Sequence, residues 1–357
     1  MTYRMIQIGL GAMGRDWCET ALPPNIEEGL VEVAAAVDIN PAVLQVAQDS
    51  LGLPAEKCYT DLGKALAENP ADFCSIVVPP AHHEAVVDAA LSHDLHILSE
   101  KPIADSLAAS VRIANKVKRA GVKMAVTMSH RFDQDKTSLR QELRSGRYGK
   151  LDYLVCHLTS DLRKFGSWGM FRHEIPNPLM IEGAVHQLDI LADLAGARCD
   201  TLYAQTWNPP WGEYAGDSQA LVTMVFENGS RAFFEGAASN AVGLHDWYGE
   251  TIRAECELGT LVLKARRLER FPYDPTKQCV SRVEGEGEKI PLLQRPKWMN
   301  TWLIEQFVHW LDGGEPMETN IEDNLQSVAL IFAVIESSRS GQIVRVQELL
   351  NQAREDW

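Results

Sequence analysis

The sequence lacks any apolar run near the roughly 20 residues that a membrane-spanning helix requires. It also lacks a signal-peptide pattern, because the polar start Met1-Thr-Tyr-Arg4 leads directly into a strand-like segment. We therefore expect a cytoplasmic protein that has no membrane partner.

Paired cysteines are missing as well. The seven cysteines are odd in number and scattered, and no two form a C-x-x-C pair, so neither a disulfide framework nor a zinc site is predicted. The ten histidines add no metal-ligand spacing beyond one i, i+4 pair with a carboxylate, which is insufficient for a catalytic zinc. We expect no metal, and most cysteines should be small buried residues. They are Cys18, Cys58, Cys74, Cys156, Cys199, Cys256 and Cys279.

Runs rich in lysine and arginine are absent, and the net charge at pH 7 is −15. An acidic chain repels polyanions, so nucleic acid is excluded as a partner and a small molecule is favoured. The 357 residues, 45% of them hydrophobic, suffice for two domains with separate cores.

The first pattern that is present is a nucleotide-binding turn. An apolar strand over 3–8 leads into Gly9-Leu-Gly11-Ala12-Met13-Gly14, and a helix follows over 15–21. Glycines at these positions permit a tight turn, let the backbone approach a pyrophosphate and allow the helix to pack on the strand. The pattern predicts a dinucleotide site formed by this turn.

Asp38 adds support for NAD as the cofactor. It ends a second predicted strand, over 31–37, and lies 24 residues after Gly14, close to where an acid binds the adenosine ribose. A carboxylate there accepts hydrogen bonds from ribose hydroxyls and repels a ribose phosphate, so NAD is favoured over NADP. The alternative is that Asp38 only caps a helix beginning at Pro41.

The N-terminal third continues this alternation of helices and strands. Apolar strands separated by helices predict a parallel sheet covered on both faces, with ligands bound beyond the carboxyl ends of the strands. The expected helices cover 41–50, 61–68, 83–91 and 106–120, and the expected strands cover 73–78, 95–98 and 122–126.

Two of the strand ends carry candidate cofactor-binding residues. Val78-Pro79-Pro80 offers a rigid apolar wall beside a flat ring, and Glu100-Lys101-Pro102 places a lysine whose ammonium Glu100 can hold. Lys101 is either a proton carrier beside a nicotinamide or a solvated charge. A third strand ends at Ser129-His130-Arg131-Phe132.

The most informative stretch is a predicted helix over 179–195 that ends at Gly196. Its apolar residues recur at helical spacing, and Glu182, His186 and Asp189 share one face. A carboxylate and an imidazole so placed can act on one proton, although such a histidine can also be structural.

These motifs together resemble the glucose-fructose oxidoreductase and inositol dehydrogenase family, often called Gfo/Idh/MocA, nearly end to end. The resemblance also covers the crossing near Arg131-Phe132 and 145–150, and a closing helix near 336–341. It implies an α/β fold with an N-terminal Rossmann domain, a doubly wound parallel sheet over 1–127. A C-terminal α+β domain over 128–357 should carry a large, mostly antiparallel open sheet that forms homodimer or homotetramer contacts, and the final helices can pack back on the first domain.

The sequence is compatible with that second domain. Residues 221–235 alternate around Asn228-Gly229, a strong hairpin signal, and residues 251–263 alternate around Leu258-Gly259. Two helices are expected afterwards, over 298–312 and 321–340.

The resemblance also implies roles for single residues. Lys101 matches the family lysine that contacts nicotinamide and substrate hydroxyl, and His186 matches the usual acid/base histidine. Glu182, a candidate catalytic residue, stands where the family usually has Asp, which leaves its role open. Asp189 matches an acidic position that follows the histidine, and it is a candidate substrate contact. Pro79, Pro80 and His83 match the stretch that lines the nicotinamide, although His83 can simply open a helix.

A basic and aromatic run, Leu162–His173, precedes the catalytic helix and is particular to this chain. Its cations Arg163, Lys164, Arg172 and His173 predict a pocket for an anionic group on the substrate, or else a loop whose charges are solvated or pair with Asp161 and Glu174. Trp168 is a candidate for stacking on a sugar, with core or interface packing as the alternative.

Three functions remain open at this stage. The first is NAD-dependent oxidation of a secondary hydroxyl on a sugar, polyol or sugar derivative. The second is an NAD-dependent glycosidase, which would begin with the same step and end redox-neutral on an anionic glycoside. The third is a non-catalytic dinucleotide-binding regulator. The sequence does not separate the first two.

Overall fold

The computed structural model describes residues 1–276 and 287–356, so Cys279 lies outside the described residues. The chain divides into two compact units, which are described separately. The first unit comprises Met1–Ser129, Lys297–Val328 and Gln352–Trp357, and the second comprises His130–Pro296 and Ala329–Asn351.

The first unit is built on a six-stranded sheet in the order β3-β2-β1-β4-β5-β6, with every pairing parallel. The order reverses between β1 and β4, which is the switch point where ligands bind in such sheets. The strands are β1 (Tyr3–Ile8), β2 (Val31–Val37), β3 (Cys58–Tyr59), β4 (Phe73–Ile76), β5 (His96–Ser99) and β6 (Met124–Val126).

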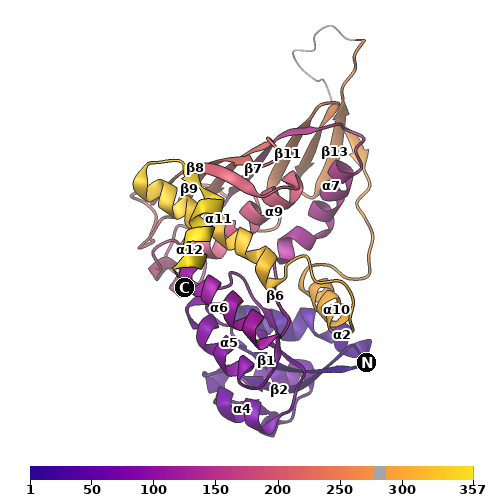
Figure 1. The fold of residues 1–357 in the computed structure, drawn as a ribbon, viewed down its shortest axis with the longest axis vertical. Helices are drawn as coiled ribbons and strands as arrows, with labels where there is room; N and C mark the ends of the chain where they lie inside the picture. The colour runs from indigo at the N-terminus through magenta and orange to yellow at the C-terminus, as the bar shows by residue number, and fades with distance from the viewer. Residues whose placement is uncertain (277–286, 357) are drawn as a thin grey trace. The chain divides into compact units, whose positions relative to one another are not determined.

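Helices lie along both sides of this sheet, with α5 and α6 on one side and α2 and α10 on the other (Figure 1). The helices are α1 (Ala12–Asp16), α2 (Pro23–Glu27), α3 (Gln45–Leu51), α4 (Leu62–Glu68), α5 (His83–Leu91), α6 (Leu107–Ala120) and α10 (Met299–Leu311). Shorter turns of other helical types are η1 (Trp17–Ala21), η2 (Pro41–Val43), η3 (Ala55–Lys57) and η4 (Pro80–His82). Side chains of Asp61 and Ser106 cap α4 and α6, as their positions before apolar periodic runs predict.

The second unit is built on a nine-stranded sheet in the order β14-β13-β12-β11-β7-β10-β9-β8-β15. All its pairings are antiparallel except that of β7 with β10. The strands are β7 (Leu151–Thr159), β8 (Cys199–Trp207), β9 (Gln219–Phe226), β10 (Arg231–Ala237), β11 (Thr251–Cys256), β12 (Gly259–Lys264), β13 (Arg267–Pro272), β14 (Glu288–Ile290) and β15 (Val344–Arg345).

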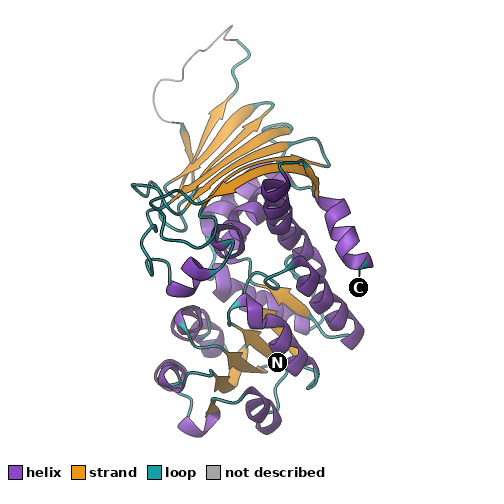
Figure 2. Cartoon of the chain, turned by 90° about the vertical axis from the view of Figure 1, so that its left-hand side faces the viewer, coloured by secondary structure: helices purple, strands orange, loops and turns teal. Residues whose placement is uncertain are grey.

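One face of this sheet packs against helices. Helix α9 contacts β7 and β10, and α7 contacts β12 and β13. Within the part of the chain that the structure describes, the opposite face carries no helix (Figure 2). The remaining helical segments are η5 (Ser129–Phe132), α7 (Gln134–Arg144), α8 (Met170–Glu174), η6 (Leu179–Ala184), α9 (Val185–Ala195), α11 (Ile321–Ser340) and α12 (Val346–Glu355). Helix α11 begins in the first unit, and its residues from 329 onward belong to the second.

The predicted fold class is confirmed, and most predicted elements lie within a few residues of their expected limits. The strand over 31–37 and the helix over 321–340 match fully, and both hairpins form at Asn228-Gly229 and Leu258-Gly259. The helix expected over 15–21 begins earlier, at Ala12, because it starts inside the glycine turn. The strand expected over 73–78 ends at Ile76, ahead of two prolines that cannot donate to a ladder.

The helix predicted over 179–195 also forms, and Gly196 ends it in a left-handed conformation with φ of +66°. Its first part, η6, has π-helical turns in place of the expected α-helix, and α9 follows without a break. Four of the six cysteines that the structure describes are buried, and Cys58 and Cys256 are partly exposed.

Candidate active site

The glycine turn between β1 and α1 is shaped by close backbone packing. A Cβ atom on Gly9, whose φ is +93°, would lie 2.1 Å from the carbonyl oxygen of Val77, and one on Gly14 would lie 2.2 Å from the carbonyl oxygen of Gly9. A Cβ on Gly11 would meet no atom within 4 Å. Two of the glycines are therefore required by the fold, whereas Gly11 borders open space.

Asp38 lies beside this turn. Its Oδ2 accepts a hydrogen bond of 2.7 Å from the backbone N–H of Leu10, and its Oδ1 accepts one of 2.8 Å from that of Asn40. The helical turn at Pro41 is capped by Asn40, whose side chain accepts from the N–H of Ala42. Asn40 therefore caps this turn, and the Asp38 carboxylate is held beside the glycine turn by the N–H of Leu10, while its contact with the adenosine ribose stays a prediction.

The strand ends after β4 and β5 hold the other predicted cofactor residues. Pro80 begins η4, and His83 begins α5 as a fully buried residue whose ring nitrogens lie 2.8 and 3.1 Å from the carbonyl oxygens of Val78 and Ile103. His83 thus ties the segment after β4 to the segment after β5. This contact supports a structural role for His83 in place of the predicted contact with nicotinamide.

Glu100 and Lys101 follow β5 directly. Glu100 is buried, and its Oε1 accepts hydrogen bonds from Trp17 Nε1 at 2.9 Å and from Asn300 Nδ2 at 3.3 Å. Burial raises the pKa of the Glu100 carboxyl group, and the neighbouring charge of Lys101 opposes that rise. The peptide bond between Lys101 and Pro102 is cis. Glu100 therefore fixes the backbone from which the half-buried Lys101 side chain extends.

In the second unit, the predicted acid/base residue His186 is buried near the start of α9. Its ring stacks on the ring of His130, with centroids 3.8 Å apart and planes at 7°. His130 was placed by the sequence at a strand end, but no role was assigned to it. The partnership of the two histidines emerges only when the turn at 129–132 packs against α9.

Asp189 is held by Arg131, the neighbour of His130. The Arg131 Nε donates to Asp189 Oδ2 at 2.9 Å, and a second short hydrogen bond completes a bidentate pair that is almost fully buried. This pairing gives Asp189 a structural role in place of the predicted contact with substrate. It also fixes the turn that carries His130 against the helix that carries His186.

Glu182 forms an ion pair with Arg172, one of the predicted anion-binding residues. The Arg172 Nε lies 3.0 Å from Glu182 Oε2, and its Nη1 donates to the carbonyl oxygen of Trp168 at 2.9 Å. The guanidinium also lies over the Trp168 and Phe171 rings, 5.4 and 4.4 Å from their centroids. The Glu182 carboxylate therefore anchors the loop before α8 to the helical segment that carries the candidate catalytic residues.

The other cations of that loop are engaged as well. Arg163 pairs with Asp161 at 2.9 Å, and Lys164 pairs with Glu213 at 2.7 Å. His173 is buried, with Nδ1 2.8 Å from the carbonyl oxygen of Glu213 and its ring stacked on Tyr214. The sequence offered a second possibility, in which the charges of this loop pair with Asp161 and Glu174. Arg163 does pair with Asp161.

Metal ions and membranes are two further possible partners of residues 1–276 and 287–356. No group of three or more His, Cys, Asp or Glu side chains there is arranged to hold a metal ion. No helix in those residues combines the length and apolar character needed to cross a bilayer.

Comparison with family models gives two matches that together span most of the chain. Residues 3–128 match the oxidoreductase family model for an NAD-binding Rossmann fold, and residues 140–346 match the model for the C-terminal alpha/beta domain of the same oxidoreductase family.

Individual proteins show the same relationship. An uncharacterized protein of Sinorhizobium fredii, y4oX, is 50% identical over 99% of this chain and 98% of its own length. The D-apiose dehydrogenase of Rhizobium rhizogenes is 25% identical over 89% of this chain and 91% of its own. The crystal structure of an Agrobacterium radiobacter oxidoreductase in complex with NAD+, L-tartaric acid and magnesium has a TM-score of 0.80 and is 23% identical, covering 97% of this chain and 99% of that one.

Proposed function

Because the chain belongs to the Gfo/Idh/MocA family of oxidoreductases, whose N-terminal domain is an NAD-binding Rossmann fold, we propose that it oxidises a secondary hydroxyl of a sugar, polyol or sugar derivative. The observation that carries this proposal is the position of Lys101, directly after β5 at the ligand-binding edge of the sheet. The names of two relatives, D-apiose dehydrogenase and inositol 2-dehydrogenase, support the substrate class.

The residues of the first unit suit NAD. The open space beside Gly11 admits a pyrophosphate, and the Asp38 carboxylate can accept hydrogen bonds from ribose hydroxyls. When NAD is bound, its nicotinamide supplies the hydride acceptor.

Oxidation of the alcohol breaks its C–H and O–H bonds and leaves a carbonyl group. The hydride goes to the cofactor, and the hydroxyl proton must go to the protein. We assign that proton to Lys101 and His186, because an amine and an imidazole can both carry a proton near neutral pH. Glu182 takes no part in the proton transfer and has a structural role, since its carboxylate is paired with Arg172.

The experiment that tests this function is incubation of the protein with NAD and a panel of sugars, polyols and glycosides. NADH formed in proportion to the oxidised product is the expected result. A glycosidase that oxidises, eliminates, hydrates and reduces again would release aglycone without accumulating NADH. A dinucleotide-binding regulator would bind NAD and turn over no member of the panel.

We further propose that the sheet of the second unit mediates homodimer or homotetramer formation. Four apolar side chains project from the uncovered face, and each keeps 37 to 41% of its surface exposed in the single chain. They are Tyr203 and Trp207 on β8 and Leu221 and Val225 on β9. Apolar side chains concentrated on one sheet face favour association.

The prediction of an anionic substrate draws no support from the pairing of Arg163, Lys164 and Arg172. Each guanidinium or ammonium group already neutralises one carboxylate of the same unit. An anionic substrate group would compete with these carboxylates for the same cations, which weakens the case for an anionic substrate.

A further inference from the structure

We propose that the second unit carries an aromatic wall, formed by Trp168, Trp247 and Tyr248, that binds a neutral sugar ring bearing an apolar substituent such as an aryl group. The inference rests on the proposed function for the place where the sugar reacts. It adds the class of substrate, which neither the family models nor the related proteins assign.

The wall is built onto the backbone next to His186. A Cβ atom on Gly183 would lie 3.1 Å from Trp168 and 3.3 Å from Trp247, so a glycine three residues before His186 leaves the space that both indole rings fill. The two rings have centroids 5.3 Å apart and planes tilted by 55°. Both are only partly buried, which leaves aromatic surface for a ligand.

The wall continues to the stacked histidines. The Trp247 ring lies edge-on to His130 at 6.2 Å, and the Tyr248 ring lies 4.8 Å from it. Since His130 stacks on His186, a chain of ring contacts joins the wall to the buried candidate acid/base group. Tyr248 keeps 39% of its surface exposed although it contacts a buried ring.

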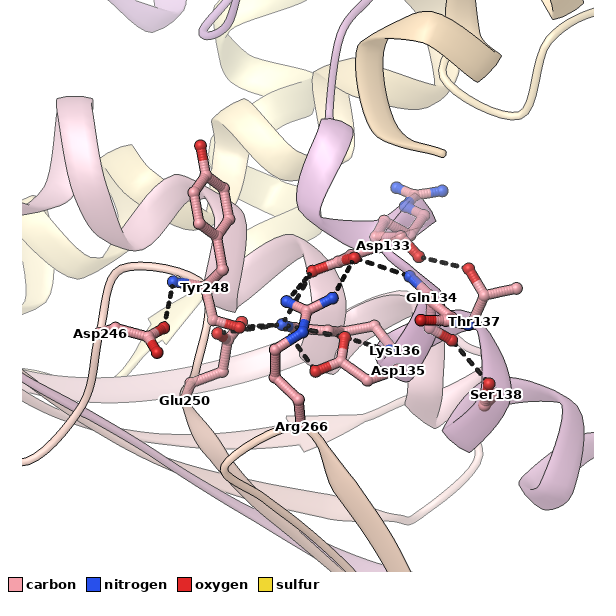
Figure 3. Close-up of polar contacts among 11 residues, drawn as sticks. Asp133, Gln134, Asp135, Lys136, Thr137, Ser138, Asp246, Tyr248, Glu250 and Arg266 are labelled. Carbon is pink, nitrogen blue, oxygen red and sulfur yellow. Dashed lines mark hydrogen bonds and ion pairs between the residues drawn. The ribbon is translucent and has the colours of Figure 1, made fainter. Parts of the chain in front are cut away.

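A buried charge network holds the segment 246–250 that supplies Trp247 and Tyr248 (Figure 3). Lys136, which is 1% exposed, donates to the carbonyl oxygen of Tyr248 and lies 3.3 Å from Glu250 and 3.2 Å from Asp135. Burial lowers the pKa of Lys136, but the surrounding carboxylates raise it by more, so the ammonium stays charged. The network therefore holds the backbone from which the Trp247 and Tyr248 rings extend.

The other side of the wall is fixed in the same manner. Arg172 binds the carbonyl oxygen of Trp168 and the carboxylate of Glu182, which lies next to Gly183. These contacts pair the charge of the guanidinium, which lies over the Trp168 ring, with the Glu182 carboxylate. Beyond the wall, Phe165 and Phe171 are 52 and 37% exposed and extend the apolar surface along the loop before and within α8.

This surface suits one kind of ligand. The C–H face of a pyranose stacks on a single aromatic ring, and the additional rings offer area that only an apolar substituent can cover. A carboxylate or phosphate placed here would have to compete with Glu182 for the Arg172 guanidinium that lies over the Trp168 ring, which disfavours charged sugars.

The test measures binding by calorimetry with the full-length protein saturated with NAD, and it requires no turnover. The probes are methyl glycosides, phenyl glycosides and phenyl glycosiduronates in several ring configurations. At least one neutral phenyl glycoside should bind roughly tenfold more tightly than its methyl and its anionic counterparts, which corresponds to one or two well-formed aromatic contacts. A panel in which no phenyl glycoside surpasses its methyl counterpart overturns the proposal.

Variants locate the effect. Trp168→Ala and Trp247→Ala should each weaken phenyl glycoside binding roughly 2- to 10-fold, whereas the conservative Trp168→Phe should retain most of it. Tyr273→Ala, which alters another aromatic residue, 61% exposed, is the control and should change nothing. If Trp168→Phe and both alanine variants fold and bind like the unchanged protein, the wall is not the site.

The same design separates this inference from the proposed function. His186→Ala should bind the phenyl glycoside while failing to oxidise it. Tight binding of a phenyl glycoside without any oxidation by the unchanged protein would contradict the proposed function and support the aromatic wall. Oxidation of methyl glycosides without tighter binding of aryl glycosides would support the proposed function and contradict the aromatic wall.

Discussion

At the scale of single residues, the glycines of the turn between β1 and α1 differ in what surrounds them, and this difference predicts different mutant behaviour. Gly9→Ala places a methyl group on the carbonyl of Val77 at a positive φ, so it should destabilise the protein by about 3 kcal/mol or more. Gly11→Ala should change the unfolding free energy by less than about 0.5 kcal/mol and weaken NAD binding. Urea unfolding and NAD titration check both; equal stability of the two variants would contradict the packing argument.

Asp38 carries the prediction about cofactor choice. Its carboxylate lies beside the glycine turn and would repel a ribose phosphate bound there, so NAD should bind much more tightly than NADP. Asp38→Ser should weaken NAD roughly tenfold, as expected for a lost charge-assisted hydrogen bond, and narrow the gap to NADP. Asp49→Ser, at an exposed position on α3, is the matched control. A titration in which the unchanged protein binds both cofactors equally would sink this prediction.

The residues that sequence alone identifies are those with local signals. Each of these residues has a fixed place relative to a strand or a helix, and the structure shows it in that place. They are the glycine turn, Asp38, Lys101 and His186. The partners that hold them come from distant segments. His130 against His186, and Trp247 against Gly183, depend on how loops pack onto one helix, and no spacing in the sequence records that packing.

At the scale of elements, α5 and α6 are joined by an ion-pair network centred on Glu84. Arg112 donates two hydrogen bonds to the Glu84 carboxylate, and Lys116 binds both Glu84 and Asp88. The Arg112 hydrogen bonds lower the pKa of Glu84 to about 2, against the opposing effect of burial. The contribution of Glu84 to the free energy of unfolding is therefore fully present above the unfolded pKa of about 4.5, and it is lost as the pH falls toward about 2.

Glu84→Gln should accordingly lower the free energy of unfolding by about 1–2 kcal/mol at neutral pH, after allowance for partial solvent screening. The difference in unfolding free energy between Glu84→Gln and the unchanged protein should shrink as the pH falls below about 4.5. Glu56→Gln, at an exposed position, should show no such gap. A gap that is absent at neutral pH, or that grows in acid, contradicts the assignment.

Elements with strong periodicity or turn chemistry are predictable, and others are not. The hairpin of β9 and β10 follows from Asn228-Gly229, and the end of α9 follows from Gly196. Helix α7 was not predicted, because the face that it buries is largely charged and polar. Lys136, Arg140 and Glu142 are among its buried residues, so the sequence shows no apolar stripe there. The π-helical turns of η6 likewise have no sequence signal, since they accompany the packing of Trp168 and Trp247 on Gly183.

At the scale of the whole molecule, the uncovered sheet face of the second unit predicts self-association. Leu221 lies on β9 among exposed Tyr203, Trp207 and Val225, and a charge introduced there would be buried in an interface. The unchanged protein should sediment as a dimer or tetramer, and Leu221→Asp should shift it toward the monomer. Leu258→Asp, at an exposed hairpin turn, should leave the mass unchanged. An unchanged protein that is already monomeric would contradict the proposed interface.

The two-sheet architecture was predictable because strand–helix alternation in the first third and alternating hairpins later specify different sheet types. The parallel pairing of β7 with β10 at the centre of the second sheet was not predictable, since three helical segments and two other strands separate these strands in the chain. The charge of the substrate cannot be predicted from the sequence for the same reason. The sequence shows the cations Arg163, Lys164 and Arg172, but it does not show which carboxylates pair with them.

The central claim is that Lys101 and His186 take the hydroxyl proton during hydride transfer to NAD. The most direct measurement is single-turnover formation of NADH, from a substrate identified by the panel, in the unchanged protein, Lys101→Ala, His186→Ala and the exposed control His93→Ala. The first two variants should lose roughly 10²–10⁴-fold in rate while binding NAD normally, and His93→Ala should lose nothing. A Lys101→Ala or His186→Ala variant that forms NADH at the unchanged rate would contradict the account.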